Sequence, residues 1–215
     1  MCTRYYMDLS PELRPFVNQV NKANSPLRDR MVEKLARPLK TDGEVRPTDM
    51  APAVALSAKG REITTFPMIW GFTNPRGGGA PIVNCRVETA SSNQFWKESW
   101  ERRRCVVPAS YYFEWERLHG ADGKVVAGQK YMMQPTGCRI MYMAGIYQIE
   151  QYRDIRYPVF AILTREAAES IYFIHDRMPV ILPQETVKEW LQIDNNSPEK
   201  ILKESISDIY FEKAV

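Results

Sequence analysis

The stretch RCVVPASYYFEWE, from Arg104 to Glu116, carries the strongest fold signal in this sequence. Its β-branched and aromatic residues form two runs, Cys105–Val107 and Tyr111–Glu116, which are typical of strands. Similar runs predict strands over residues 53–57, 62–72, 82–88, 130–134, 140–149, 158–163 and 178–182. Helical patterns predict helices over about 10–20, 25–35, 92–103, 165–173, 183–192 and 197–209. We therefore expect an α+β fold: a mostly antiparallel, strongly curved, barrel-like sheet with peripheral helices.

The composition predicts one domain over residues 1–215, since 44% of the residues are hydrophobic, 26% are charged, and no Ser/Gly/Pro-rich linker divides the chain. The net charge of +3 limits any nucleic-acid surface to a local patch of Arg and Lys. No apolar run approaches the roughly 20 residues of a membrane helix, so we expect a cytoplasmic protein. The turn-rich segment Asn74–Gly79 is expected to be a flexible loop, because it lacks the GxxxxGK[ST] order of a P-loop.

The cysteines and histidines do not predict a metal site, a disulfide framework or a cofactor, because they form no CxxC pair and no cluster with ligand spacing. They are Cys2, Cys85, Cys105, Cys138, His119 and His175.

Cys2, which follows the initiator Met1, is the most informative single residue. Removal of Met1 would leave an α-amine and a thiol on one residue. Such a 1,2-aminothiol condenses with an aldehyde to an imine, and the thiol then closes on the imine carbon to give a thiazolidine ring. The two groups titrate at about 8 and about 8.5, so both nucleophilic forms exist near neutral pH. The alternative is that residue 2 is part of an ordinary disordered terminus.

Three polar residues alternate along the predicted strand 82–88. Asn84, Arg86 and Glu88 would emerge on one face, because strand side chains alternate with period two. Together they would present an amide, a guanidinium and a carboxylate. A solvent-facing strand edge is the alternative interpretation.

Two further residues are candidates for proton transfer. Glu114 lies in an aromatic strand, where partial burial would raise its pKa, although a salt bridge to one of Arg102–Arg104 is an alternative. His175 precedes Asp176 at a helix-to-strand turn, where charged neighbours can set its protonation state. Lone histidines are more often structural.

Several ordered motifs span nearly the whole chain, and through them it resembles the SRAP family, the SOS response-associated peptidase domain proteins, as a bacterial member. The matching motifs are Met1–Tyr5, Trp70–Phe72, Asn84–Thr89, Arg104–Ala109, Tyr112–Trp115, Ala144–Tyr147, Ile162–Thr164 and His175–Leu182. The sequence departs from the family pattern at two places. Thr3 stands where the family usually has glycine, and Glu44–Thr48 only loosely resembles the family's Asn-containing Pro-Thr loop.

The resemblance implies a set of residue roles. Cys2 would form a covalent link to an abasic site, Asn84 would orient the reacting groups, and Glu114 and His175 would move protons. Arg4 and Arg86 would hold phosphates, because guanidinium groups match phosphate geometry. Trp70 would stack beside a flanking base. The loop that contains Pro47 would correspond to the family's DNA-wedging loop.

The resemblance also implies the activity and the partner. A monomer would bind single-stranded DNA that contains abasic sites and shield the lesion as a thiazolidine cross-link in the DNA damage response. It would be associated with the nucleoid when bound to damaged DNA, and would need no metal or membrane. Autopeptidase removal of residues before Cys2 is a related expectation. The alternatives are an N-terminal-nucleophile amidohydrolase that uses Cys2 and a non-catalytic single-strand binding module.

Overall fold

The computed structural model describes residues 2–57, 62–120, 123–193 and 198–214. Its strands are β1 (Arg4–Met7), β2 (Gly43–Val45), β3 (Met50–Leu56), β4 (Ile63–Trp70), β5 (Asn84–Arg86), β6 (Arg104–Ala109), β7 (Tyr111–His119), β8 (Val125–Pro135), β9 (Met141–Tyr152), β10 (Ile155–Glu166), β11 (Arg177–Pro179), β12 (Ile181–Leu182) and β13 (Ile209–Lys213). Its helices are α1 (Arg14–Ala23), α2 (Ser25–Leu35), α3 (Val87–Ala90), α4 (Gln94–Arg102), α5 (Val187–Leu191) and α6 (Pro198–Lys203), with 3-10 turns η1 (Glu169–Ile171) and η2 (Gln184–Thr186).

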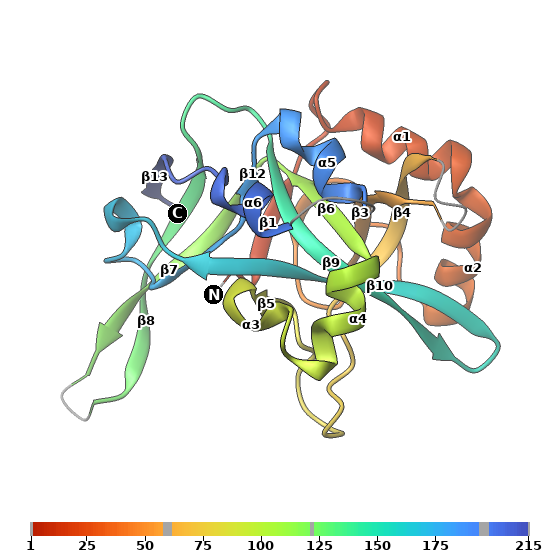
Figure 1. Ribbon diagram of the computed structural model, residues 1–215, viewed down its shortest axis with the longest axis horizontal. Helices are drawn as coiled ribbons and strands as arrows, with labels where there is room; N and C mark the ends of the chain where they lie inside the picture. Colours follow the sequence, from red (N-terminus) through yellow and green to blue (C-terminus); the bar gives the residue numbers. More distant parts are fainter. Residues whose placement is uncertain (1, 58–61, 121–122, 194–197, 215) are drawn as a thin grey trace.

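The core is a closed barrel of five strands. Strands β10, β4, β3, β6 and β9 pair in that order, and β9 pairs again with β10 to close the ring (Figure 1). Most pairings are antiparallel, whereas β10 runs parallel to both β4 and β5. A second sheet, β13–β8–β7–β1–β2, continues from this core, where the backbone of Ser110 donates to Tyr6 at 2.8 Å. The predicted α+β fold with a curved, mostly antiparallel, barrel-like sheet is confirmed.

Strand β10 organises the region around the predicted site. Besides β9 and β4, it pairs in parallel with β5, which places Ile162 opposite Asn84. It also pairs antiparallel with β11, which places Arg165 opposite Met178. Segments that are about 80 residues apart in the sequence are therefore aligned on one strand.

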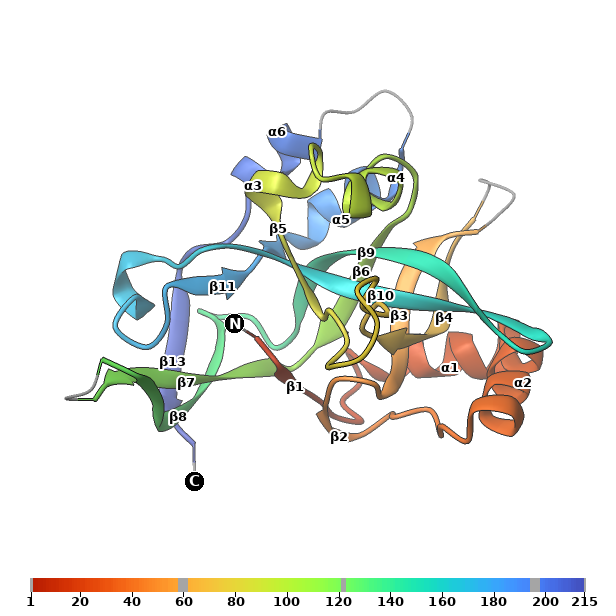
Figure 2. The same cartoon turned by 90° about the horizontal axis from the view of Figure 1, so that it is seen from below.

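The helices cover the barrel on two sides. Helices α3 to α6 gather on one side of the barrel, while α1 and α2 lie on another (Figure 2). Trp100 of α4 contacts Trp190 of α5 with ring centroids 6.0 Å apart. Val17 and Val20 are the buried residues of α1, which packs on β4. The apolar faces of these helices thus pack against the sheet on both sides, because burial of apolar surface stabilises the fold.

Two of the predicted helices near the C-terminus are wrong. The helix expected over residues 165–173 is absent from this described segment: β10 continues to Glu166, and only the short turn η1 follows. Pairing with β11 satisfies the backbone of Arg165 and Glu166 and so overrides their local helical pattern. The helix expected over 197–209 is shorter, because α6 ends at Lys203 and Ile209 begins β13; residue 197 lies outside the described residues.

Two other boundaries move by a few residues. The first helix begins at Arg14 and not at Ser10, because residues 11–13 form a turn in which Ser10 Oγ accepts from the Leu13 amide at 3.4 Å. The strand expected over 82–88 ends at Arg86, where α3 begins. Glu88 is therefore helical, and only Asn84 and Arg86 of the expected polar row are strand residues.

Candidate active site

Cys2 lies directly before β1, and its side chain is fully buried. Its thiol donates to the carbonyl oxygen of Arg4, with the sulfur 3.6 Å from that oxygen. Burial raises the pKa of this thiol well above its usual range, and the nearby charge of Glu114 raises it further. The thiol is therefore protonated at neutral pH, so its proton must be transferred when sulfur attacks.

Asn84 is joined directly to the Cys2 backbone. The Asn84 Nδ2 donates to the Cys2 carbonyl oxygen at 2.8 Å, although the two residues are 82 positions apart. The parallel pairing of β5 with β10 fixes the position of Asn84. Its Oδ1 is buried and accepts no hydrogen bond from any other described residue. This side chain can therefore hold the Cys2 backbone and still present an acceptor to a bound molecule.

Glu114 is a buried carboxyl group on β7, next to β1. Its Oε1 accepts from the backbone N–H of Trp115 at 3.3 Å. Burial raises the pKa of Glu114, while the charge of Arg117 opposes this shift. Two of the arginines suggested as salt-bridge partners of Glu114 have other contacts. Arg103 pairs with Glu98 at 2.9 Å, and Arg104 donates to a carbonyl oxygen at 3.1 Å. A raised pKa suits a carboxyl that both donates and accepts protons near neutral pH.

His175 is buried in the turn before β11. Its Nδ1 accepts from the backbone N–H of Arg177 at 2.9 Å, so the neutral ring carries its proton on Nε2. Burial lowers the pKa of His175 to about 4. Asp176 Oδ1 is also 2.9 Å from Nδ1, but the neutral ring has no charge to pair with it, and Asp176 pairs with Arg117 at 2.6 Å. His175 is thus a neutral donor through Nε2 at pH 7.

Two arginines that the sequence patterns did not single out support these residues. Arg177 binds both carboxylate oxygens of Glu88, at 2.6 and 2.9 Å, and the carbonyl oxygen of Thr164 at 2.6 Å. This bidentate pair ties α3 to β10 and β11. Arg117 holds Asp176 beside His175. The sequence feature that could have pointed to these arginines is their spacing from the predicted site residues. Arg177 lies two residues after His175, and Arg117 lies three residues after Glu114.

Arg4 is engaged with a carboxylate. Its Nε lies 3.1 Å from Glu44, which also binds Arg46 at 2.8 Å and Lys130 at 3.3 Å. Burial opposes ionisation of Glu44, yet hydrogen bonds from Arg46 and Lys130 outweigh it and lower its pKa. Arg4 is 30% exposed. A phosphate that binds Arg4 would therefore have to compete with Glu44.

The burial of Trp70 contradicts its expected stacking role. The Trp70 side chain is 0% exposed, its ring stacks on Phe160 with centroids 6.1 Å apart, and its Nε1 donates to Val83 at 3.0 Å. No face of the ring is open to a base. Pro47 is half-buried in the turn before β3, where Thr48 has a positive φ of 77°. The Thr48 amide donates to the Trp70 carbonyl oxygen at 2.8 Å, so the backbone of Trp70 holds the turn that contains Pro47.

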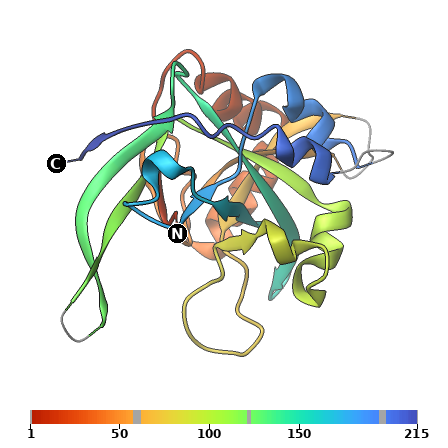
Figure 3. The same cartoon turned by 60° about the vertical axis from the view of Figure 1, so that its left-hand side comes forward.

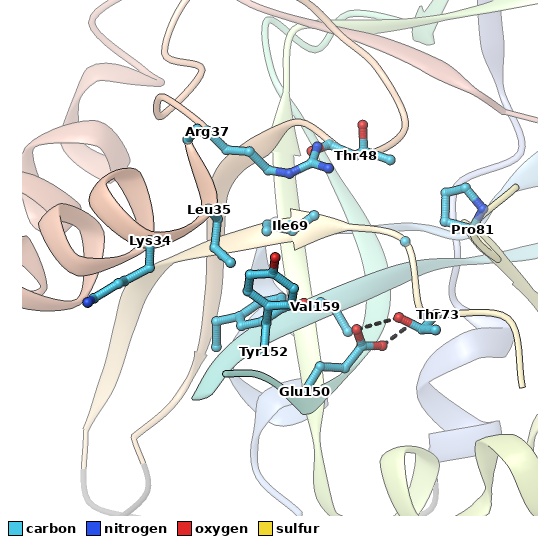
Figure 4. A pocket seen from close by; sticks show the side chains of 13 residues that line it. Lys34, Leu35, Arg37, Thr48, Ile69, Thr73, Pro81, Glu150, Tyr152 and Val159 are labelled. Atoms are coloured by element: carbon cyan, nitrogen blue, oxygen red, sulfur yellow. Dashed lines mark hydrogen bonds between the residues drawn. The ribbon is translucent and has the colours of Figure 1, made fainter. Parts of the chain in front are cut away.

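Two cavities flank this region. One, of about 470 Å³, lies among Arg37, Thr48, Tyr152 and Glu150, and the Glu150 carboxylate accepts from Thr73 at 2.7 and 2.8 Å (Figure 4). It contains none of the residues expected to carry chemistry. The other, of about 460 Å³, is lined by Asn84 and Arg86 together with the loop after β4. The second cavity therefore adjoins the Cys2 site.

The described residues contain no disulfide and no cluster suited to a metal ion. All four cysteines are free, and burial raises the pKa of Cys85 to about 12. Within the described ranges, no group of three or more His, Cys, Asp or Glu side chains could hold a metal ion. Among the helices that the structure describes, none has the length and apolarity needed to cross a membrane.

Comparisons with known proteins agree with the fold. The chain is 30% identical over 167 residues to the abasic site processing protein YoaM of Bacillus subtilis, covering 73% of this chain and 71% of YoaM. It is 28% identical over 137 residues to the abasic site processing protein YedK of Escherichia coli, covering 64% and 59%. A crystal structure of a Bacteroides thetaiotaomicron protein shares the fold, with a TM-score of 0.68 at 20% identity over 100% of this chain and 92% of that one. The family profile described as SOS response associated peptidase (SRAP) matches residues 1–213, and the chain therefore belongs to the SRAP family.

Proposed function

We propose that this chain processes abasic sites in DNA by a covalent reaction of Cys2. Once the preceding residue is removed, the α-amine and thiol of Cys2 capture the aldehyde of an abasic deoxyribose as a thiazolidine. The observation that carries this proposal is the hydrogen bond of 2.8 Å between Asn84 and the Cys2 carbonyl, beside the buried Glu114 carboxyl with its raised pKa. The family match and the names of YoaM and YedK support the same substrate class.

The first step is opening of the sugar ring, because an abasic deoxyribose is mostly a closed hemiacetal. Glu114 in its protonated form gives its proton to the ring oxygen as the C1′–O4′ bond breaks, and the C1′ hydroxyl releases its proton to solvent. The aldehyde carbon is then free to react. A carboxyl with a raised pKa is suited to this step, since it still holds a proton near pH 7.

The next steps form the adduct. The Cys2 amine attacks C1′, and one of its protons moves to the carbonyl oxygen to give a carbinolamine. The Glu114 carboxylate left by ring opening takes a proton from solvent and gives it to the carbinolamine hydroxyl, which leaves as water. The nitrogen then returns its remaining proton to Glu114, which leaves a neutral imine. His175 assists by donating a hydrogen bond from Nε2 to that hydroxyl. Sulfur then bonds to the imine carbon while the thiol proton moves to nitrogen, which avoids a free thiolate in a site where burial disfavours one. One water is released.

We further propose that the substrate is single-stranded and that Arg86 contacts its backbone. The net charge of +3 favours a small footprint. A lesion in a single strand can be turned outward into the site without breaking a duplex. Such a protein would act in the cytoplasm, at the nucleoid, as a monomer in the response to DNA damage.

The direct test is denaturing electrophoresis of the protein mixed with an abasic single-stranded oligonucleotide. Wild type should give a heat-stable, slowly migrating band, and Cys2→Ala should give none of this product. Cys2→Ser keeps the amine but lacks sulfur, so it should give a band only after borohydride reduction traps the imine. Cys138→Ser is the matched control, because Cys138 is a half-buried free cysteine outside the site. A heat-stable band with Cys2→Ala would end the proposal.

A second experiment separates the remaining alternatives. Intact abasic duplex, single strand and junction should be compared, and tighter binding to duplex would contradict the proposed substrate form. Acyl-enzyme formation with small amides, without reaction with abasic DNA, would favour the amidohydrolase. Reversible, salt-sensitive binding unchanged by Cys2→Ser, with no adduct, would favour a binding module.

The name of the family motivates a related proposal, that the chain removes the residues before its own Cys2. A variant with a short added leader should be produced without methionine aminopeptidase and weighed by intact mass spectrometry. Loss of the leader from wild type and its retention in Glu114→Gln would support self-processing. A fully retained leader in wild type would refute it.

A further inference from the structure

The cavity of about 460 Å³ beside Asn84 has the form of a ligand site. It lies between the loop that follows β4, strand β5 and the start of α4, and this loop projects away from the barrel (Figure 3). The volume falls within the roughly 300–1,000 Å³ typical of small-molecule sites. The residues that matter for its chemistry are Asn74, Arg76, Asn84, Arg86, Asn93 and Phe95.

The lining of this cavity is rich in hydrogen-bond donors. It contains two guanidinium groups, Arg76 and Arg86, and no carboxylate among the described residues that line it. Neither arginine forms an ion pair with another described residue, in contrast to Arg4. Two lining residues use their side-chain oxygens internally: Asn74 Oδ1 accepts from Arg76 N at 3.1 Å, and Asn93 Oδ1 accepts from Phe95 N at 2.9 Å. Their Nδ2 groups stay available as donors, so the cavity favours an anion.

The cavity also has an aromatic wall. Phe95 is half-buried, and its ring packs edge-on against Trp96 and Phe72, with centroids 4.5 and 5.9 Å away. These neighbours fix the ring in place. A fixed aromatic ring beside guanidinium groups is the combination that binds nucleotides in single strands, where bases stack and phosphates pair with arginine.

The cavity is connected to the nucleophile through one side chain. Asn84 lines it, and the same Asn84 donates to the Cys2 carbonyl. The cavity of about 470 Å³ is lined by Lys34 and Arg37 as well as Glu150, but none of its lining residues contacts Cys2 by a hydrogen bond among the described residues. A DNA strand whose abasic residue reacts with Cys2 would therefore have an adjacent nucleotide within reach of this donor-rich cavity.

We infer that this cavity binds the nucleotide next to the abasic residue, with its phosphate on Arg76 and Arg86 and its base against Phe95. The inference rests on the proposed function and names a subsite for it. The loop after β4 contributes through the Arg76 side chain and not as a P-loop. Because stacking against an aromatic ring does not depend on the identity of the base, we expect this subsite to accept any base.

The first test measures binding of a lesion-free single-stranded oligonucleotide over a series of salt concentrations. Arg76→Ala should weaken binding roughly fivefold to tenfold and reduce the salt slope by about 0.7, as expected for loss of one phosphate contact. Arg139→Ala is the matched control, because Arg139 is 86% exposed and lies far along the chain, in the turn before β9. Equal effects of the two substitutions would overturn the inference, because they would show only a general loss of charge.

The second test uses Asn93→Asp, which is nearly isosteric. Aspartate caps a helix as well as asparagine does, so α4 should keep its N-terminal cap and the protein its melting temperature. The new charge should nevertheless weaken binding at least fivefold, because it adds a carboxylate to the lining that contains Arg76 and Arg86. Unchanged affinity in the folded variant would count against the subsite.

The third test removes the neighbouring nucleotide. Abasic oligonucleotides should be truncated on the 5′ or the 3′ side of the lesion and compared in wild type and Arg76→Ala. The defect of Arg76→Ala should vanish for truncation on one side only, which identifies the strand direction. A defect that survives both truncations would refute the assignment. Lesion-free binding that depends on Arg76 without any cross-link would instead refute the Cys2 chemistry and leave the subsite standing.

Discussion

Glu114→Gln should stabilise the protein at alkaline pH while it slows the reaction with abasic DNA. The carboxyl of Glu114 is buried, and burial raises its pKa. A carboxyl whose pKa is higher in the folded state contributes its stability below the unfolded value of about 4.3 and loses it as the pH rises through the folded value. Glutamine keeps the oxygen that accepts from Trp115 but has no proton to lose. The variant should therefore escape this loss.

The size of the effect follows from the same linkage. Between the unfolded and the folded pKa of Glu114, the difference in unfolding free energy between variant and wild type should grow by about 1.4 kcal/mol per pH unit. Above the folded pKa it should be constant. For a chain of 215 residues, 1 kcal/mol corresponds to roughly 2–4 °C in melting temperature.

Urea unfolding at several pH values between 4 and 9, together with single-turnover cross-linking gels, measures both consequences. Cross-linking should fall by about 10²–10⁴-fold, the range of general acid–base catalysis. Glu116→Gln is the control, because Glu116 lies two residues further along β7 and is half-buried. A stability difference that does not change with pH would refute desolvation of Glu114, and undiminished cross-linking would refute its role in proton transfer.

Four further substitutions test the other residues. Wild type should lose about 3 kcal/mol of stability as the pH falls from about 6.5 to about 4, because His175 stays neutral in the folded state while the unfolded chain binds a proton; in His175→Gln this loss should disappear from urea titrations. Asn84→Ala should cost about 1 kcal/mol through its lost hydrogen bond and slow adduct formation on single-turnover gels, and an unchanged rate would show that Asn84 is only structural. Trp70→Ala should cost about 3–5 kcal/mol in chemical denaturation, whereas Trp70→Phe should keep its affinity for single-stranded DNA in anisotropy titrations; a selective loss of affinity would restore the stacking role.

Local patterns predicted the elements whose stability is local. The helix Ser25–Leu35 was predicted with its observed bounds, because Ser-Pro marks its start and the following residues favour a helix. Every strand of the barrel was predicted; four were predicted too short, whereas the strand predicted over 62–72 is longer than β4. The end of β10 depends on its pairing with β11, which no local pattern reveals.

The sequence singles out candidate site residues but not the contacts between them. Cys2 and Asn84 were singled out separately, and the structure joins them by a hydrogen bond across 82 positions. The family resemblance suggested an exposed Trp70, whereas the interior of the barrel buries it. An aromatic residue at a strand end has the same local signal in both environments, and only the closure of the sheet decides between them.

Because β10 pairs with both β5 and β11, the number of residues in β10 determines the positions of both Asn84 and the turn before Arg177. Deletion of one residue within Val159–Thr164 would turn every later side chain of that strand to the opposite face, displacing Asn84 and the turn before Arg177 together. Lengthening the loop around Gly78 would leave this alignment intact. Homologues should therefore keep the length of β10 constant, whereas an insertion around Gly78 should leave the Cys2–Asn84 contact in place and alter only the Arg76 side of the nucleotide subsite.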